Sequence, residues 1–263
     1  MNFVGSHIIS VDQFDRAAAD RIFEVADNMQ PYAMRRRITR VLQGAILSNM
    51  FFEPSTRTRV SFGSAFNLLG GEVRETTEAK SSSLAKGESL YDTARVLSGY
   101  SDVIVMRHPE SGSVAKFAEA SRVPVINGGD GPNEHPSQAL LDLYTMRTEI
   151  AAQGQSIDGL SIALIGDLRY GRAVHSLCKL LCLYDNIRLH LISPPELALP
   201  HDIVGLLKAA GHEVREFNDM AEGIQGVDIL YVTRTQEERF PSQQEADRYR
   251  CLVPVNHAIY TQN

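Results

Sequence analysis

Apolar runs alternate with amphipathic segments along almost the whole chain, and this is the pattern of an α/β protein. Short apolar runs predict buried strands, whereas segments in which apolar residues recur every three to four positions predict helices. Residues 56–69 are an example, because their apolar side chains keep helical spacing and Gly70-Gly71 follows as a stop signal. We therefore predict parallel sheets that are covered by helices on both faces.

The predicted elements form two halves on either side of a polar segment at residues 151–158. A capping box, Ser10-Val-Asp-Gln13, is expected to open the first helix, which continues to about Met29. The other helices of the first half are predicted at residues 56–69, 88–98, 114–120 and 136–150, and its strands at 44–52, 72–75, 102–107 and 123–127. The second half is predicted to contain strands at 160–166, 187–192, 213–216 and 228–233 and helices at 171–184, 202–210 and 219–225. We predict two domains, residues 1–150 and 151–263, each a parallel sheet flanked by helices, with an active site in the cleft between them.

Length and composition place the chain among soluble globular proteins. It has 263 residues, 43% of them hydrophobic and 22% charged, and its 26 basic and 32 acidic residues give a net charge of −6. This balance argues against a nucleic-acid scaffold and against a binder of membrane surfaces. No apolar run reaches the ~18 residues that a membrane span needs, and the N-terminus lacks the pattern of a signal peptide, so a cytoplasmic location is expected.

The three cysteines, Cys178, Cys182 and Cys251, lack the spacing of a disulfide framework or a zinc site, which favours a reducing compartment. Cys178 and Cys182 lie four residues apart in an apolar helical segment. We expect these two side chains to pack in the core, where free cysteine behaves as a small hydrophobic residue.

Residues 53–59, Glu-Pro-Ser-Thr-Arg-Thr-Arg, carry the strongest functional signal, because they join a predicted strand to a predicted helix. Glu53 precedes a proline and is held extended, and Ser55 is placed to cap the helix. Three hydroxyls and the guanidiniums of Arg57 and Arg59 then crowd a helix end whose N–H groups lack partners and whose dipole is positive. Cations are unfavourable there, and a bound anion such as a phosphate resolves the conflict.

Further candidate residues follow other predicted strands or open other predicted helices. Arg107 closes a strand and is expected to reach a carbonyl or phosphate oxygen, with a surface salt bridge as an equal alternative. His135 stands at a helix N-terminus, where a neutral imidazole is expected to donate to a polarised carbonyl oxygen, the alternative being a capping residue. Gln138 offers a donor and an acceptor to an amide-like group. Lys86 belongs to the polar loop of residues 81–88, which is either a flexible surface loop or a lid that adds a cation.

Two arginines in the second half, Arg172 and Arg234, are candidates for binding carboxylates. Arg172 ends the segment Gly166-Asp-Leu-Arg-Tyr-Gly171-Arg172, which nearly fits a nucleotide P-loop but lacks its lysine and its Ser or Thr. Two guanidiniums that face one cleft suit a dicarboxylate, because each grips a carboxylate with two hydrogen bonds. The sequence contains no zinc, dinucleotide or nucleophile-elbow motif, and we expect neither a metal nor an organic cofactor.

Six segments together resemble the catalytic chains of the aspartate carbamoyltransferase family and keep that family's order and spacing to about residue 240. They are Phe51-Phe-Glu-Pro-Ser-Thr-Arg-Thr-Arg59, Ser82-Ser-Leu-Ala-Lys86-Gly-Glu, Val105-Met-Arg107-His-Pro, His135-Pro-Ser-Gln138, Gly166-Asp-Leu-Arg-Tyr-Gly-Arg172 and Asp228-Ile-Leu-Tyr-Val-Thr-Arg234-Thr-Gln236. The resemblance implies transfer of the carbamoyl group of carbamoyl phosphate to the amine of L-aspartate, which is the committed step of pyrimidine biosynthesis. It also implies a homotrimer with shared active sites and leaves the attachment of regulatory chains open.

The same resemblance implies a role for each candidate side chain. The phosphate is held by Ser55, Thr56, Arg57 and Thr58. The carbamoyl carbonyl is polarised by Thr58, Arg107 and His135, and the carbamoyl nitrogen is met by Gln138. The carboxylates of aspartate are taken by Arg172 and Arg234, helped by Gln236. A lid from a neighbouring subunit contributes Lys86 and either Ser82 or Ser83. The residues with catalytic roles are thus Arg57, Thr58, Arg107 and His135.

The resemblance has one departure and leaves two alternatives. In the family, a His-Pro-Leu-Pro-Arg loop and a closing helix follow the second domain, and this sequence contains neither. One alternative is therefore a truncated, non-catalytic relative that binds carbamoyl phosphate or partner chains. The other is an ornithine carbamoyltransferase, which shares the phosphate turn and the His-Pro-x-Gln segment. The Lys86 loop and the Arg234-Thr-Gln236 pattern favour aspartate.

Overall fold

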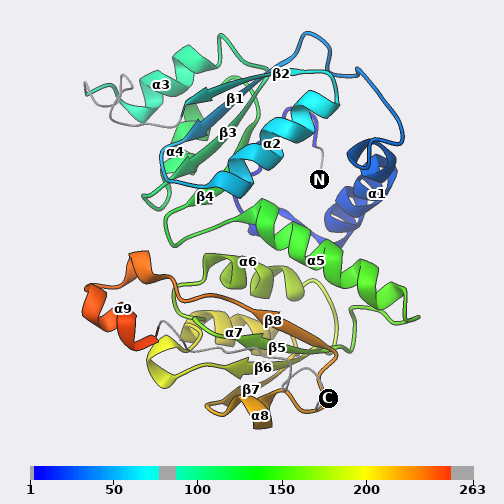
Figure 1. The fold of residues 1–263 in the computed structure, drawn as a ribbon, viewed down its shortest axis with the longest axis vertical. Helices are drawn as coiled ribbons and strands as arrows, with labels where there is room; N and C mark the ends of the chain where they lie inside the picture. Colours follow the sequence, from blue (N-terminus) through cyan, green and yellow to red (C-terminus); the bar gives the residue numbers. More distant parts are fainter. Residues whose placement is uncertain (1–2, 77–86, 250–263) are drawn as a thin grey trace. The chain divides into compact units, whose positions relative to one another are not determined.

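The computed structural model describes residues 3–76 and 87–249 of the chain. The chain divides into two compact units, Met1–Ser137 and Gln138–Asn263, each built on a four-stranded parallel sheet (Figure 1). This confirms the predicted fold class of two α/β domains with helix-flanked parallel sheets. The functional division into residues 1–150 and 151–263 stays a prediction.

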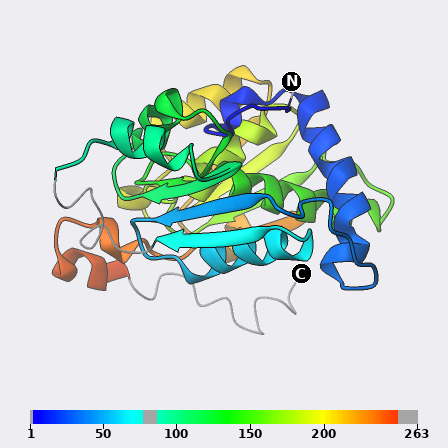
Figure 2. The same ribbon diagram turned by 90° about the horizontal axis from the view of Figure 1, so that it is seen from above.

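The first unit contains a sheet with strand order β2-β1-β3-β4. Its elements are η1 (Val11–Gln13), α1 (Arg16–Ala33), β1 (Ile46–Phe51), α2 (Thr56–Leu68), β2 (Glu72–Thr76), α3 (Leu90–Leu97), β3 (Val103–His108), α4 (Ser113–Ala120) and β4 (Val125–Asp130). Successive side chains of a strand point to opposite faces, so each strand feeds two cores. Leu47 and Val105 pack with Phe66 of α2 on one face, whereas Ile104 packs with Phe117 of α4 on the other. The helices α2 and α4 accordingly cover opposite faces of this sheet (Figure 2).

The second unit contains a sheet with strand order β7-β6-β5-β8. Its elements are α5 (Pro136–Ala151), β5 (Ser161–Ile165), α6 (Arg172–Leu181), β6 (Arg188–Ile192), η4 (Pro195–Leu197), α7 (His201–Ala209), β7 (Glu213–Phe217), α8 (Met220–Gly223), β8 (Ile229–Val232), η5 (Glu237–Arg239) and α9 (Gln243–Tyr249). Every residue of β5 is buried, as expected for a central strand of a sheet that is covered on both faces. Cys178 is fully buried in α6, which confirms its predicted core packing, whereas Cys182 is only half-buried and Cys251 lies outside the described residues.

The first predicted helix is wrong at its start. The capping box at Ser10 is present, but it opens only the short 3-10 helix η1. Phe14 is extended and buried, which ends η1, and α1 then begins at Arg16 with Asp15 as its cap, accepting from Ala18 N at 2.7 Å. Anchoring of Phe14 in the core therefore outweighs continuation of the helix.

Two elements near residue 240 escaped prediction. The helices η5 and α9 are short and largely polar, and Ala246 is the one buried residue that they contain in the described part of the chain. Such segments lack the apolar periodicity from which a helix is inferred.

Candidate functional site

In each sheet, the strand that comes first in the sequence is flanked by a later strand on either side. The candidate residues lie where the strand order changes direction in this way. In the first unit β2 and β3 flank β1, and in the second unit β6 and β8 flank β5. Ligands of open parallel sheets bind beyond the carboxyl ends of the strands at such points. The Ser55 turn follows β1 and Arg107 lies near the end of β3, whereas Arg172 follows β5 and Arg234 follows β8.

The first turn of α2 presents polar groups that the fold itself does not use. Ser55 is the N-cap, as predicted, but its hydroxyl makes no hydrogen bond to the helix, and the turn contains no acidic side chain. Thr56 and Arg57 are exposed, and Thr58 is half-buried. Within residues 3–76 and 87–249, no salt bridge engages Arg57. Hydroxyls, helix-terminal N–H groups and a guanidinium are the groups that suit the binding of an anion at a helix N-terminus, and the assignment of these residues to such a site stays a prediction.

Arg59 is not part of this group, contrary to the expectation that two guanidiniums crowd the turn. Its Nη1 lies 3.0 Å from Glu75 Oε2 on β2, and its carbonyl oxygen accepts from Asn49 Nδ2 at 2.9 Å. Asn49 also donates to Glu75 Oε1 at 3.3 Å. Arg59 therefore fastens α2 to the sheet, and Arg57 alone supplies the charge of the turn.

Arg107 emerges at the carboxyl edge of the sheet, as predicted, and contacts the turn after β1 and the strand β4. Its Nη2 lies 2.9 Å from Glu53 Oε2, and the two side chains are only 13% and 18% exposed. Its Nη1 donates to the carbonyl oxygen of Gly128 at 3.3 Å. Arg107 thus links the turn after β1 to β4. The alternative of a salt bridge at Arg107 is therefore found, but the pair is mostly buried rather than on the surface, and sequence reasoning did not identify Glu53 as the partner.

The loop between β4 and α5 holds His135 in a buried position, at 6% exposure. Asp130, which is 1% exposed, organises the loop because its carboxylate accepts from Gly112 N, Asn127 Nδ2, Asn133 Nδ2 and Glu134 N at 2.9 to 3.1 Å. A Cβ at Gly131 would lie 2.7 Å from Pro109 O, and φ there is +55°. The backbone path to His135 is therefore fixed by a buried carboxylate and by a glycine. The sequence predicted neither role.

His135 Nδ1 lies 3.3 Å from Ser137 Oγ. When the serine hydroxyl donates to this nitrogen, the neutral ring carries its proton on Nε2. The histidine then presents an N–H donor from the opposite side of the ring, which is what polarising a carbonyl oxygen requires.

Asp167 ties together the two loops at the strand ends of the second unit. It is fully buried, and it accepts from Tyr170 N at 3.0 Å and from Gln236 N at 2.9 Å. The approach is close, because a Cβ at Gly166 would lie 2.2 Å from Thr233 O. Gln236, a predicted aspartate-binding residue, is thus placed by a carboxylate that sequence reasoning did not single out.

The two candidate carboxylate-binding arginines have different surroundings. Arg172 is buried in the first turn of α6, whereas Arg234 is exposed and pairs with Glu238, its Nη1 donating to Oε2 at 2.9 Å. That hydrogen bond raises the pKa of Arg234 and lowers the pKa of Glu238. The prediction that both arginines face one ligand stays a prediction.

Gln138 lies in the first turn of α5, and its amide has a fixed neighbour. Its Nε2 donates to Asp142 Oδ1 at 2.8 Å, and Tyr231 Oη on β8 donates to Asp142 Oδ2 at 2.9 Å. Sequence reasoning missed Asp142 and Tyr231, although the i,i+4 spacing of Gln138 and Asp142 on a predicted helix was a usable signal. Ser82, Ser83 and Lys86 lie outside the described residues.

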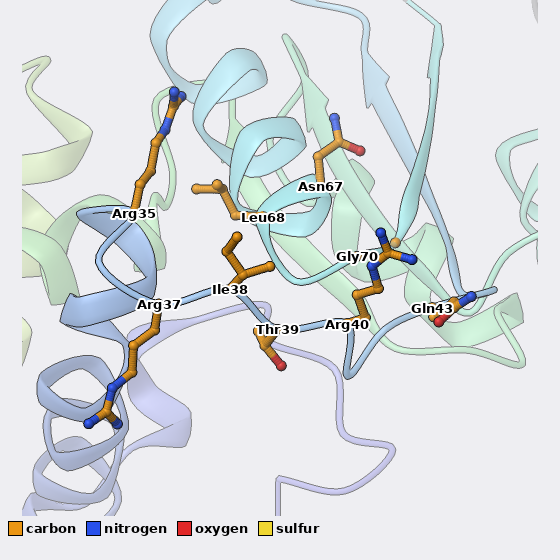
Figure 3. Close-up of a pocket in the computed structure, with 10 residues that line it drawn as sticks. Arg35, Arg37, Ile38, Thr39, Arg40, Gln43, Asn67, Leu68 and Gly70 are labelled. Carbon is orange, nitrogen blue, oxygen red and sulfur yellow. The ribbon is translucent and has the colours of Figure 1, made fainter.

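A cavity of about 630 Å³ lies elsewhere in the first unit, between the segment after α1 and the end of α2. Arg35, Arg37 and Arg40 line it together with Ile38 and Leu68, and no predicted site residue does so. The three guanidiniums point in different directions and do not converge on a common point (Figure 3). The cavity therefore lacks the arrangement that a small anion requires.

In the described part of the chain, no group of three or more His, Cys, Asp or Glu side chains is placed to hold a metal ion. The same residues contain no helix with the length and apolar character needed to cross a membrane.

Comparison with known protein families gives two matches. Residues 6–148 match the model of the aspartate/ornithine carbamoyltransferase carbamoyl-P binding domain. Residues 158–257 match the model of the Asp/Orn binding domain of the same family. Together the two matches cover most of the chain.

Individual relatives agree with this result. The aspartate carbamoyltransferase catalytic subunits of Saccharophagus degradans and Cellvibrio japonicus are each 68% identical over 262 residues, which is 100% of this chain and 78% of each relative. The structure of aspartate transcarbamoylase from Trypanosoma cruzi in complex with carbamoyl phosphate and aspartate superposes with a TM-score of 0.88 at 37% identity, covering 98% of this chain and 82% of that one. The catalytic subunit of the enzyme from M. jannaschii gives 0.84 at 47% identity, covering 93% and 78%.

Proposed function

The chain belongs to the aspartate/ornithine carbamoyltransferase family, and from this premise we propose that it transfers the carbamoyl group of carbamoyl phosphate to the amine of L-aspartate. The products are N-carbamoyl-L-aspartate and phosphate. The observation that carries the proposal is the turn after β1, which exposes hydroxyls and Arg57 at a helix N-terminus and is joined to Arg107 at the end of β3 by the Glu53 ion pair. The names of the relatives at 68% identity favour aspartate over ornithine as the acceptor.

We assign phosphate binding to the first turn of α2. Ser55, Thr56 and Thr58 offer hydroxyl donors, and the backbone N–H groups of the turn point along the helix axis toward the anion. Arg57 adds a forked cation, which matches the geometry of phosphate oxygens. The energetic conflict of a cation at a positive helix end disappears once the phosphate is bound.

Charge development explains the roles proposed for Thr58, Arg107 and His135. When the amine attacks the carbonyl carbon, negative charge grows on the carbonyl oxygen. Donors that are already in place stabilise that charge by ~3–4 kcal/mol each. The Glu53 ion pair holds the side chain of Arg107, and the Asp130 hydrogen bonds fix the backbone of the loop that carries His135. The leaving phosphate can accept the amine proton, so no side-chain base is required.

The second unit supplies the cations for the amino acid. Aspartate carries two carboxylates, and Arg172 and Arg234 are proposed to bind them, helped by Gln236. Ornithine has an ammonium in place of the second carboxylate, and a second guanidinium would repel it.

The cellular setting follows from the family. We propose a cytoplasmic homotrimer that carries out the committed step of pyrimidine biosynthesis. Ser82 or Ser83 and Lys86 are proposed to complete the site of a neighbouring subunit, as the resemblance of their loop implies. Sedimentation of the purified chain tests the trimer directly.

The decisive experiment supplies carbamoyl phosphate with L-aspartate and L-ornithine separately and measures the carbamoylated product and released phosphate. Product with aspartate alone is expected. Product only with ornithine contradicts the choice of acceptor. Tight binding of a phosphonate joined to aspartate, without any turnover, favours a non-catalytic relative instead.

A further inference from the structure

A partly buried series of hydrogen bonds in the second unit connects β8 to the first turn of α5. Tyr231 Oη donates to Asp142 Oδ2 at 2.9 Å, and Gln138 Nε2 donates to Asp142 Oδ1 at 2.8 Å. Asp142 and Tyr231 are half-buried, and so is Gln138. Both oxygens of the Asp142 carboxylate are thus used, and each of them accepts a hydrogen bond from a different element.

The chemistry of Asp142 decides which way the amide of Gln138 is turned. An ionised carboxylate only accepts hydrogen bonds, so it selects the NH₂ end of the amide and rejects the carbonyl end. The carbonyl oxygen Oε1 then points away from Asp142. An amide that turned over would place two acceptors against each other at hydrogen-bond distance, which is unfavourable in a partly buried position.

We propose that Asp142 is a positioning residue, which orients the side chain of Gln138 so that its carbonyl oxygen accepts a hydrogen bond from the NH₂ group of the carbamoyl moiety. This inference rests on the proposed function, in which Gln138 meets the carbamoyl nitrogen. It adds the reason why that contact is selective: an NH₂ group is recognised by an acceptor, and the carboxylate holds the NH₂ end of Gln138 and so turns its carbonyl oxygen to the opposite side. Phosphate alone has no NH₂ group and gains nothing from this orientation.

Tyr231, on β8, provides the second hydrogen bond that holds the carboxylate of Asp142. Its hydroxyl donates to the second oxygen of Asp142, which anchors the carboxylate to β8, while the first oxygen accepts from Gln138. Burial raises the pKa of Asp142, and the hydrogen bonds from Tyr231 and Gln138 oppose that rise. The same burial, together with the carboxylate, raises the pKa of Tyr231, so the phenol stays a proton donor. Cys178 is the other titratable group that faces Tyr231, and burial raises its pKa as well.

A double-mutant cycle on the full chain tests the proposal. The variants are Gln138→Ala, Asp142→Ala and the double variant, with kcat/KM for carbamoyl phosphate and the inhibition constant of inorganic phosphate as readouts. Each single variant is expected to lower kcat/KM about 10- to 100-fold, whereas phosphate inhibition changes less than about twofold. The double variant is expected to be no worse than Gln138→Ala alone, because Asp142 acts only through Gln138.

Two further variants keep the test informative if Asp142→Ala folds poorly. Asp142→Asn has nearly the same shape but offers both a donor and an acceptor, so the amide of Gln138 can turn either way and kcat/KM is expected to fall about 2- to 10-fold. Tyr231→Phe retains the contact between Asp142 and Gln138 and is expected to have a smaller effect than Asp142→Asn. Thermal unfolding of every variant reports the structural cost separately.

Several results overturn the proposal, and they are distinct from failure of the proposed function. Losses that multiply in the double variant, or wild-type kcat/KM in Asp142→Asn, show that Asp142 does not act through Gln138. Equal weakening of carbamoyl phosphate and inorganic phosphate shows a general structural role. If Gln138→Ala itself leaves kcat/KM unchanged, the assigned role of Gln138 falls together with the inference, while turnover with aspartate still stands.

Discussion

Arg57 provides the sharpest test of the anion site, because its neighbour on the same helix is a built-in control. Arg57 is exposed, has no salt bridge within the described residues and stands at the positive end of α2. Arg59 lies two residues further on and is held by Glu75 at 3.0 Å. The two arginines share a helix turn and a charge, but only one of them is used by the fold.

The magnitudes for Arg57→Ala follow from these surroundings. Removing a cation from a helix N-terminus is expected to stabilise the fold by about 0.3–1 kcal/mol, because the unfavourable interaction with the dipole is lost. Catalysis is expected to lose ~3–4 kcal/mol of transition-state stabilisation, which corresponds to a decrease of about 10²- to 10³-fold in kcat/KM. Phosphate binding, measured by calorimetry, is expected to be lost as well.

Arg59→Ala is expected to show the opposite behaviour. Its ion pair with Glu75 is partly exposed, at 32% and 39%, so its loss should cost no more than about 1 kcal/mol of stability. Phosphate binding is expected to remain close to that of the unchanged chain. The reasoning is refuted if Arg57→Ala binds phosphate like the wild type, or if it destabilises the fold more than Arg59→Ala does.

Three other predictions concern the supporting structure. Gly131→Ala forces a Cβ to 2.7 Å from a carbonyl oxygen at φ +55°, so we expect thermal unfolding to show a loss of about 1–3 kcal/mol in the free energy of unfolding. We also expect a lower kcat, because the change displaces His135, and an unchanged kcat contradicts the role of this loop. Burial raises the pKa of the Cys178 thiol, so this thiol should resist a thiol reagent at pH 8 in the folded chain. Mass spectrometry of labelled peptides measures the reaction, and rapid labelling of Cys178 would count against its core position. The hydrogen bond from Arg234 lowers the pKa of Glu238, so the ionised carboxylate stabilises the fold. This contribution to stability is fully present at a pH above the ordinary pKa of glutamate, and it is lost as the pH falls through the lowered pKa. Because both side chains are mostly exposed, Glu238→Gln should remove less than about 1 kcal/mol of this acid dependence in thermal unfolding, and an unaltered pH profile refutes the pairing.

Much of the architecture follows from local pattern. The strands β1, β3, β5 and β6 lie within the predicted apolar runs to one or two residues, because a strand that is buried on both faces must be apolar along its length. The helix after β1 begins at the predicted position because a proline and a serine fix its start. The failure at Ser10 is instructive, since a correct local signal was overruled by the burial of Phe14.

Local sequence pattern was therefore enough to predict most of the elements, the fold class and the residue types that point to an anionic substrate. The tertiary structure decided which carboxylates hold those residues in place, namely Glu53 for Arg107, Asp130 for the His135 loop and Asp167 for Gln236. Glu53 and Asp167 lie far along the chain from the residues they hold, as the separation of 69 positions between Asp167 and Gln236 illustrates, whereas Asp130 and Glu134 are only four positions apart. Helical and strand periodicity reflects interactions over a few residues, whereas a hydrogen bond between two strand ends depends on strand order. No local pattern encodes that order, so the supporting carboxylates became visible only in the folded chain.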